Sequence, residues 1–233
     1  EPKLVRIDLG KAVGIMPLSE QIQGEYYTIG SRLRVYIKDI ERENRGPQLI
    51  LSRGNEAFIE ELFKQEVPEI ETGAVEIKNV AREAGRRTKL AVISNVPGVD
   101  PVGTFVGGHG TRVQSVMNEI GDQEKIDIVP FSEDPAVFIA NAISPAEVVS
   151  VEINEEDKKA KVFVTEDQQS IAIGRAGQNV RLASRLTGYE LYIERKEPIT
   201  KAAPAQRKNI EDSLFSAIEE SGSDDTENTD TEN

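Results

Sequence analysis

The sequence predicts an α+β protein built from several small domains: a short β-barrel, two copies of one α/β unit, and a disordered acidic tail. Three observations support this prediction. Apolar and polar residues alternate near the start of the chain, one pattern of strands, helices and a glycine turn occurs twice after residue 73, and the residues from 211 onward are acidic and poor in apolar side chains. A chain of 233 residues has room for two or three such domains.

Residues 1–53 have the pattern of short strands separated by turns. Within residues 32–40, the apolar side chains of Leu33, Val35 and Ile37 alternate with polar ones, which is the period of a half-buried strand. Similar signals occur at residues 4–7, around Ile15 and at residues 48–52. We therefore expect a small all-β barrel over residues 1–53.

The apolar period changes to that of a helix after Gly54. Asn55 is a good N-cap residue, and Pro68 ends the run. Between them, apolar side chains recur at helical spacing: Phe58, Ile59, Leu62 and Phe63. We expect a linker helix within residues 54–72, between the barrel and the next unit.

One pattern occurs twice after residue 73, and it is the most informative feature of the sequence. The first copy, residues 73–143, has strand signals at 75–80 and 89–93, a segment at 102–106, the turn 107–110, a helix that ends at Gly121, and a strand at 125–129. The second copy, residues 144–198, has strand signals at 149–153 and 161–165, a segment at 169–173, the turn 174–177, a helix at 178–187, and a strand at 190–194. A single GxxG turn is common by chance, but two of them 67 residues apart in the same order of elements indicate a duplicated domain.

The two GxxG turns form the candidate binding site. Glycine lets the backbone turn tightly without Cβ clashes, so peptide N–H groups and the N-terminus of the next helix can approach a phosphate directly. Nearby arginines supply positive charge along a nucleic-acid backbone. The candidate site residues are Gly107, Gly108, His109, Gly110 and Arg112 in the first unit, and Gly174, Arg175, Ala176, Gly177, Arg181 and Arg185 in the second.

The net charge of −13 is unusual for a protein that binds a polyanion, but it is unevenly distributed. Nine acidic residues and no basic one lie between Glu211 and the C-terminus, so only −4 of the −13 remains for residues 1–210. Residues 73–112 contain six Lys or Arg against three acidic residues, and residues 168–189 contain three Arg and no acidic residue. Each GxxG turn therefore lies in a locally basic stretch.

Residues 199–233 lack any apolar period, and we expect them to be disordered. Two readings of this acidic tail stay open. It is either a solvated end with no special role or a segment that competes with the bound nucleic acid for the basic faces of the protein.

Both turns resemble the signature of the KH domain, which is an apolar residue, GxxG, two polar residues and a second apolar residue, at residues 106–113 and 173–180. A KH domain clamps about four backbone nucleotides of single-stranded RNA with its GxxG loop. Longer segments resemble the NusA family of transcription elongation, termination and antitermination factors: residues 98–103, 124–130, 140–147 and 170–184. Residues 14–20, 29–37 and 47–53 are similar to the OB-fold domain of that family, so the resemblance covers most of residues 1–198.

This resemblance implies an OB-fold barrel followed by two tandem prokaryotic-type (type II) KH domains. It implies binding of single-stranded nascent RNA, contact with RNA polymerase mainly through an N-terminal domain, and cooperation with other antitermination factors to modulate pausing, termination and antitermination. That N-terminal domain and the first barrel strand have no counterpart here, and residue 1 is Glu rather than Met, so we expect a fragment of a longer protein. His109 stands where the family more often has a basic residue.

Simpler interpretations of these residues stay open. The glycines also suit an ordinary connection between helices, and Arg181 and Arg185 also suit a solvated helix face. His109 fits an exposed loop residue as well as a phosphate contact. Three tyrosines of the barrel suit either base stacking or packing: Tyr26, Tyr27 and Tyr36.

Composition and motifs argue against an enzyme. The absence of Cys excludes disulfides, thiolate nucleophiles and Cys-based metal sites, and the sequence has no GxxxxGK[ST], GxSxG or HExxH motif. No apolar run approaches the roughly 18 residues of a membrane span. We therefore expect a monomeric, cytoplasmic RNA-binding protein with no cofactor; the rival hypotheses are a ribosome-associated KH protein and the accessory RNA-binding part of a ribonuclease.

Overall fold

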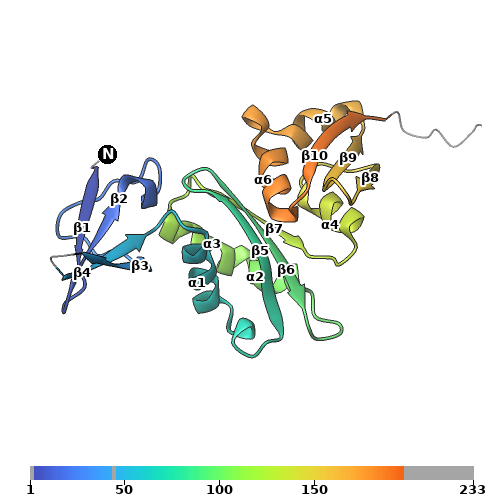
Figure 1. The fold of residues 1–233 in the computed structure, drawn as a ribbon. Helices are drawn as coiled ribbons and strands as arrows, with labels where there is room; N and C mark the ends of the chain where they lie inside the picture. Colours follow the sequence, from blue (N-terminus) through green and yellow to red (C-terminus); the bar gives the residue numbers. More distant parts are fainter. Residues whose placement is uncertain (1–2, 44–45, 197–233) are drawn as a thin grey trace, which may run out of the picture. The chain divides into compact units, whose positions relative to one another are not determined.

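The computed structural model describes residues 3–43 and 46–196, which contain ten strands and six α-helices (Figure 1). The acidic tail predicted over residues 199–233 lies outside the described residues. None of the helices in the described ranges combines the length and the apolar character needed to cross a lipid bilayer.

The first four strands form one sheet in the order β1-β2-β4-β3. β1 pairs with β2 and β3 pairs with β4 in antiparallel fashion, whereas β2 and β4 are parallel. Met16 and Leu51 are fully buried in this small sheet domain. The strands are β1 Leu4–Asp8, β2 Val13–Pro17, β3 Tyr36–Glu43 and β4 Gly46–Ser52. The predicted all-β segment is thus confirmed, and its sheet is compatible with the expected OB-fold.

The strand predicted over residues 32–40 begins only at Tyr36. The carbonyl oxygen of Arg34 accepts a hydrogen bond of 2.6 Å from the guanidinium of Arg53. A side chain from a distant part of the chain therefore occupies a backbone acceptor that a longer strand would give to its neighbour. The alternation of apolar residues does not reveal such a competitor.

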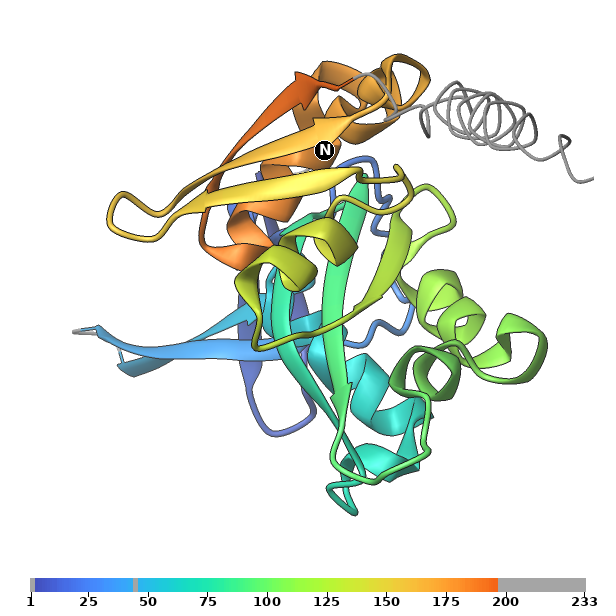
Figure 2. The same ribbon diagram turned by 90° about the vertical axis from the view of Figure 1, so that its right-hand side faces the viewer.

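The remainder of the described chain consists of two units with the same order of helix, strand, strand, helix, helix, strand. In each unit the first two strands are antiparallel, and the second strand is parallel to the last. The first unit comprises α1 Glu56–Glu66, β5 Val75–Glu83, β6 Arg87–Ser94, α2 Pro101–Val106, α3 Thr111–Ile120 and β7 Lys125–Pro130. The second comprises α4 Pro135–Ala142, β8 Ser150–Asn154, β9 Lys159–Val164, α5 Glu166–Ile173, α6 Gln178–Thr187 and β10 Glu190–Arg195. The predicted duplication is confirmed, and Figure 2 shows the three strands of the second sheet side by side.

The helix predicted as a linker, α1, packs into the core of the first unit. Asn55 caps its start, because the side chain accepts a hydrogen bond from the backbone N–H of Ala57 at 2.8 Å. Its buried face lies against α2, α3 and the sheet, and each such apolar side chain contributes roughly 1.5–3 kcal/mol of stability. The buried residues of this face are Phe58, Ile59, Leu62 and Phe63, which share a core with Phe105, Val116 and Ile120.

The core of the second unit extends to the β5–β6–β7 sheet of the first unit, called the first sheet below. α4 packs with α6 and the second sheet, and α6 lies against β5 and β6 (Figure 1). Small or slim side chains of the first sheet allow this approach and join the second core: Ala81, Ala91 and Val129. α1 and α4 thus pack with the sheet that follows each of them, and the boundaries predicted at residues 73 and 144 fall after these helices.

Candidate nucleic-acid interface

The first GxxG loop is a tight turn between α2 and α3. Gly107 ends α2 with φ of 77°, and Gly110 precedes α3 with φ of 76°. Between them, His109 adopts a left-handed conformation with φ of 55°. Gly108 and His109 are exposed, so the interior of the turn faces solvent.

The second GxxG loop repeats this backbone geometry between α5 and α6. Gly174 has φ of 75°, Ala176 has φ of 52° and Gly177 has φ of 71°. Arg175 and Ala176 are exposed, like the corresponding residues of the first loop. The same three positions of each GxxG loop are left-handed, although the interior residues differ in chemistry.

The first and last glycines of each loop have different tasks. A Cβ at Gly174 would lie 2.8 Å from the backbone nitrogen of Asn179, and one at Gly107 would lie 2.7 Å from Cγ of Arg112. At Gly110 a Cβ would meet nothing within 4 Å, and at Gly177 only Nη1 of Arg181 at 4.0 Å. The first glycine therefore permits close packing, and the last one leaves open space at the start of a ten-residue helix that no side chain caps.

Arg112 is engaged inside the first unit. Its guanidinium donates to both carboxylate oxygens of Glu69, at 3.0 and 3.1 Å, and to the carbonyl oxygen of Thr104 at 2.8 Å. These bonds hold the pKa of Glu69 below its ordinary value. Arg112 thus braces α2 and α3 against the turn that follows α1, and Glu69 compensates its charge.

Arg181 ties the second GxxG loop to the first unit. Its Nε donates to Glu83 of β5 at 2.7 Å, and its Nη1 donates to the carbonyl oxygen of Ala176 within the loop at 3.1 Å. Gln178 donates to the other oxygen of Glu83 at 2.8 Å. The bond from Arg181 is the main reason that the pKa of Glu83 lies below its ordinary value.

The other predicted contacts remain available to a ligand. Arg175, Arg185 and His109 are exposed, and none of their side chains makes a hydrogen bond or ion pair with the rest of the described chain. Arg185 lies close enough to Glu83 for its charge to lower the pKa of that carboxyl further. The positive charge that is not paired with a carboxylate near the second loop therefore comes from Arg175 in the loop and Arg185 on α6.

The three tyrosines of the first domain have three different environments. The Tyr27 hydroxyl donates to Glu25 at 2.7 Å and accepts from the N–H of Ile22 at 3.1 Å; burial raises the pKa of Tyr27 well above its ordinary value. Tyr36 packs against the core of the first unit. Tyr26 is 90% exposed and is the one of the three with a ring open to base stacking.

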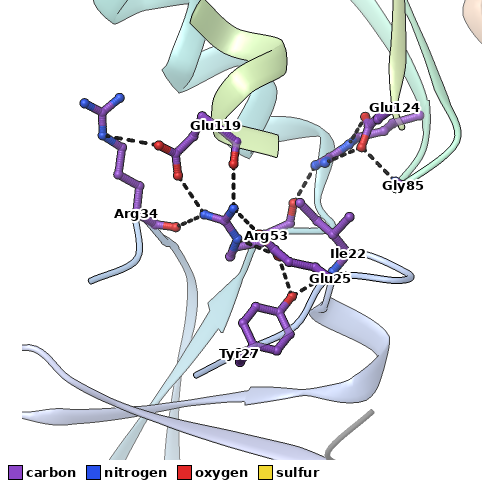
Figure 3. Close-up of polar contacts among 9 residues, drawn as sticks. Ile22, Glu25, Tyr27, Arg34, Arg53, Gly85, Glu119 and Glu124 are labelled. Atoms are coloured by element: carbon purple, nitrogen blue, oxygen red, sulfur yellow. Dashed lines mark hydrogen bonds and ion pairs between the residues drawn. The ribbon is translucent and has the colours of Figure 1, made fainter. Parts of the chain in front are cut away.

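Arg53 joins the first domain to the first unit (Figure 3). Its side chain is 1% exposed and donates to both carboxylate oxygens of Glu25, and also to the carboxylate and the carbonyl oxygen of Glu119 at 2.9 and 2.8 Å. Burial opposes ionisation of Arg53, but the bonds to Glu25 and Glu119 raise its pKa overall. Because Glu119 belongs to α3, this cluster fixes α3 relative to the preceding sheet.

A second buried pair, Arg82 and Glu124, fixes the tip of the β5–β6 hairpin. Both side chains are fully buried and make a bidentate ion pair at 2.8 and 2.9 Å. Glu124 also accepts from the backbone N–H of Gly85 at 2.8 Å (Figure 3). Arg86 follows Gly85 at this tip and was not among the predicted site residues. The sequence feature that could have indicated it is the basic turn between two predicted strands.

Comparison with known proteins agrees with this geometry. The model of the NusA-like first KH domain matches residues 53–131, and that of the NusA-like second KH domain matches residues 135–201. Proteins named transcription termination/antitermination protein NusA are 52% identical over 193 residues in Thermus thermophilus and 48% over 192 residues in Halalkalibacterium halodurans, which is 83% and 82% of this chain and 50% of each relative. The Bacillus subtilis protein of the same name is 43% identical over 224 residues, which is 95% of this chain and 60% of that protein.

The chain spans about half the length of the curated relatives that it matches. Its two αββααβ units coincide with the two matched domains, and each carries its GxxG turn between its second and third helices, which are the fourth and fifth elements of the unit. The predicted resemblance is thereby confirmed: this chain belongs to the NusA family and contains the family's first and second KH domains.

Proposed function

We propose that this chain binds single-stranded RNA through both GxxG loops and acts on transcription by contacting RNA as it leaves RNA polymerase. One observation carries the proposal. Two loops of closely similar backbone geometry, at equivalent places in two repeated domains, expose their interior residues and an uncapped helix start. This arrangement suits a phosphate that approaches the backbone of the loop closely.

The relatives support the biological setting, because their name describes transcription termination and antitermination. We propose modulation of pausing, termination and antitermination, with nascent RNA, RNA polymerase and other antitermination factors as partners. The chain would act as a monomeric binding factor in the cytoplasm, with no catalysis of its own. RNA that keeps its length during incubation with the chain would agree with the last point, and shortening would favour a nuclease.

The test replaces the two interior residues of both loops with aspartate: Gly108→Asp, His109→Asp, Arg175→Asp and Ala176→Asp. The fold should tolerate these changes. A Cβ at Gly108 meets nothing within 4 Å, and aspartate is among the residues that adopt the left-handed conformation found at His109 and Ala176. Because the new carboxylates lie where phosphates would sit, binding of a labelled, unstructured RNA measured by fluorescence anisotropy should be lost.

Lys158→Asp is the matched control. Lys158 is an exposed residue of the β8–β9 turn with φ of 52°, so it combines the same backbone conformation with a change from a positive to a negative charge. It should leave RNA affinity nearly unchanged. Retention of wild-type affinity by the variant with four aspartates would refute the proposed function, provided that its thermal unfolding matches that of the control.

A further inference from the structure

A hollow of about 550 Å³ lies beside the second GxxG loop, where three parts of the described chain meet. Gln23 comes from the segment after β2, Arg86 from the tip of the β5–β6 hairpin, and Gln123 from the segment after α3. The second loop contributes Arg175, and α6 contributes Arg181. No single domain forms this hollow.

The lining is chemically uniform. Three arginines are accompanied by glutamines, glycines and Ala176, and no acidic or aromatic side chain of the described residues lines the hollow. Guanidinium groups and side-chain amides donate hydrogen bonds to phosphate and ribose oxygens, and the described lining offers no aromatic ring on which a base would stack. Three guanidinium groups with no carboxylate among them suit the negative charge of a sugar–phosphate backbone.

The position of Arg86 is fixed before any ligand arrives. Gly85 approaches the first domain so closely that a Cβ there would lie 2.4 Å from the carbonyl oxygen of Gln23, and its N–H is bonded to the buried carboxylate of Glu124. Arg86 donates from Nε to the side-chain oxygen of Gln23 at 3.1 Å. Its two terminal nitrogens have no hydrogen-bond partner in the described chain and are free for a ligand.

Residues of the second GxxG loop line the hollow, and α3 connects it to the first GxxG loop. α3 starts directly after Gly110 of the first loop and ends at Ile120, three residues before Gln123 in the hollow. A helix of this length spans about 15 Å. The exposed side chains of α3 are neutral and polar, since its Glu119 is bonded to Arg53: Thr111, Gln114, Ser115 and Asn118. No exposed carboxylate on α3 therefore repels a strand that runs from the first loop to the hollow.

We propose that this hollow binds the sugar–phosphate backbone of single-stranded RNA between the two GxxG loops, with Arg86 and Arg175 as phosphate ligands. The inference rests on the proposed function, and it adds a binding residue, Arg86, that belongs to the first KH domain but serves the loop of the second. The contact is independent of base sequence, because only backbone atoms are bound.

The experiment compares Arg86→Gln with Arg195→Gln in the full chain. Arg195 is the control, because it is exposed, its Nε also donates to a glutamine oxygen, and it does not line the hollow; unlike Arg86, it also pairs with a carboxylate, that of Glu166 at 3.0 Å. Binding of labelled oligo(A) and oligo(U) of roughly twelve nucleotides, long enough to span more than one KH site of about four, is measured by anisotropy at several salt concentrations. Arg86→Gln should weaken both RNAs equally, about five- to tenfold at low salt, and should reduce the salt slope of log K by about 0.7, the value of one phosphate contact.

Gln23→Ala tests the charge of Arg86 separately from its position, because it removes the hydrogen-bond partner of Arg86 but keeps the charge. The salt slope of log K for RNA binding should then equal that of the wild type. The inference is overturned if Arg86→Gln binds like Arg195→Gln, or if it loses affinity with an unchanged salt slope. In either case, loss of binding by the variant with four aspartates would leave the proposed function standing. A wild-type chain that binds neither RNA would instead remove the proposed function itself.

Discussion

Replacing Arg53 with methionine tests whether the cluster in Figure 3 stabilises the protein. Methionine keeps an unbranched apolar stem but removes five hydrogen bonds, two to the carboxylate of Glu25, one to the carboxylate of Glu119, and two to the backbone oxygens of Arg34 and Glu119. It also removes the guanidinium that lies 5.1 Å from the ring centre of Phe58. Two carboxylates then face each other without their shared counter-ion.

The expected loss is about 3 kcal/mol. Removing one partner of a buried ion pair costs about 3–5 kcal/mol, because the remaining charge is left without compensation. The side chains of Glu25 and Glu119 are 19% and 24% exposed, so water reaches them in part and the lower end of that range applies. For a folded unit of this size, such a loss lowers the melting temperature by roughly 6–12 °C.

The assay is urea unfolding of the full chain followed by circular dichroism. Arg34→Gln is the control, because Arg34 is 58% exposed and lies 3.9 Å from the same Glu119, so its removal should change the unfolding free energy by less than about 1 kcal/mol. If Arg53→Met costs no more than Arg34→Gln, the cluster does not stabilise the junction and the reasoning from burial is refuted.

Two further predictions concern the loops and their support. Gly174→Ala should destabilise the chain by about 2–4 kcal/mol, because the new Cβ would clash with the backbone of Asn179. Gly110→Ala should cost only about 1 kcal/mol, because its Cβ meets no neighbour and only the left-handed backbone conformation is strained. Urea unfolding midpoints in the reverse order would contradict the packing role of Gly174. Glu83→Gln should remove the pH-dependent stabilisation that comes from the bond between Glu83 and Arg181. That bond lowers the pKa of Glu83 in the folded state, so it stabilises the fold fully above the ordinary pKa of about 4.5. The stabilisation is lost as the pH falls through the lower pKa of the folded state. Because Arg181 is 42% exposed, the difference between wild type and Glu83→Gln should be under about 1 kcal/mol at pH 6 and smaller at pH 3, and an equal difference at both pH values in urea titrations would rule out this linkage.

Local patterns were sufficient to predict the repeated domain. The period of apolar residues and the glycines at helix ends report on neighbours within a few residues, so the helix at 178–187 and the strand starting at residue 125 lie where the sequence places them. The cap at Asn55 is likewise a local interaction, formed with Ala57. These elements needed no knowledge of distant contacts.

Sequence spacing could not predict the ion-pair partners of the site arginines. Arg112 is bonded to Glu69, 43 residues away, and Arg181 to Glu83, 98 residues away. Both arginines were predicted as RNA contacts because they follow a GxxG turn, but only the folded structure brings an acidic side chain to each of them. The RNA contacts themselves stay predictions, with Arg175 and Arg185 as the arginines that the fold leaves accessible.

Arg86 illustrates the opposite omission. Its place in a basic stretch was visible, but nothing in the sequence says that the hairpin tip which carries it lies beside the second GxxG loop. That proximity depends on α6 lying against β5 and β6, which the small side chains of Ala81 and Ala91 permit. The position of Arg86 beside the second loop is therefore set by packing between the two KH domains, which the sequence pattern does not report.

The burial of α1 sets the smallest piece of this protein that is suitable for separate study. A fragment that starts at residue 73 would contain the entire first sheet and its GxxG turn, yet it would expose Phe105, Val116 and Ile120 to water where α1 had covered them. Such a fragment should aggregate or unfold, and its failure to bind RNA would say nothing about the loop. Dissection of the two KH domains should therefore begin at or before Asn55, so that the cap and its helix accompany the first sheet.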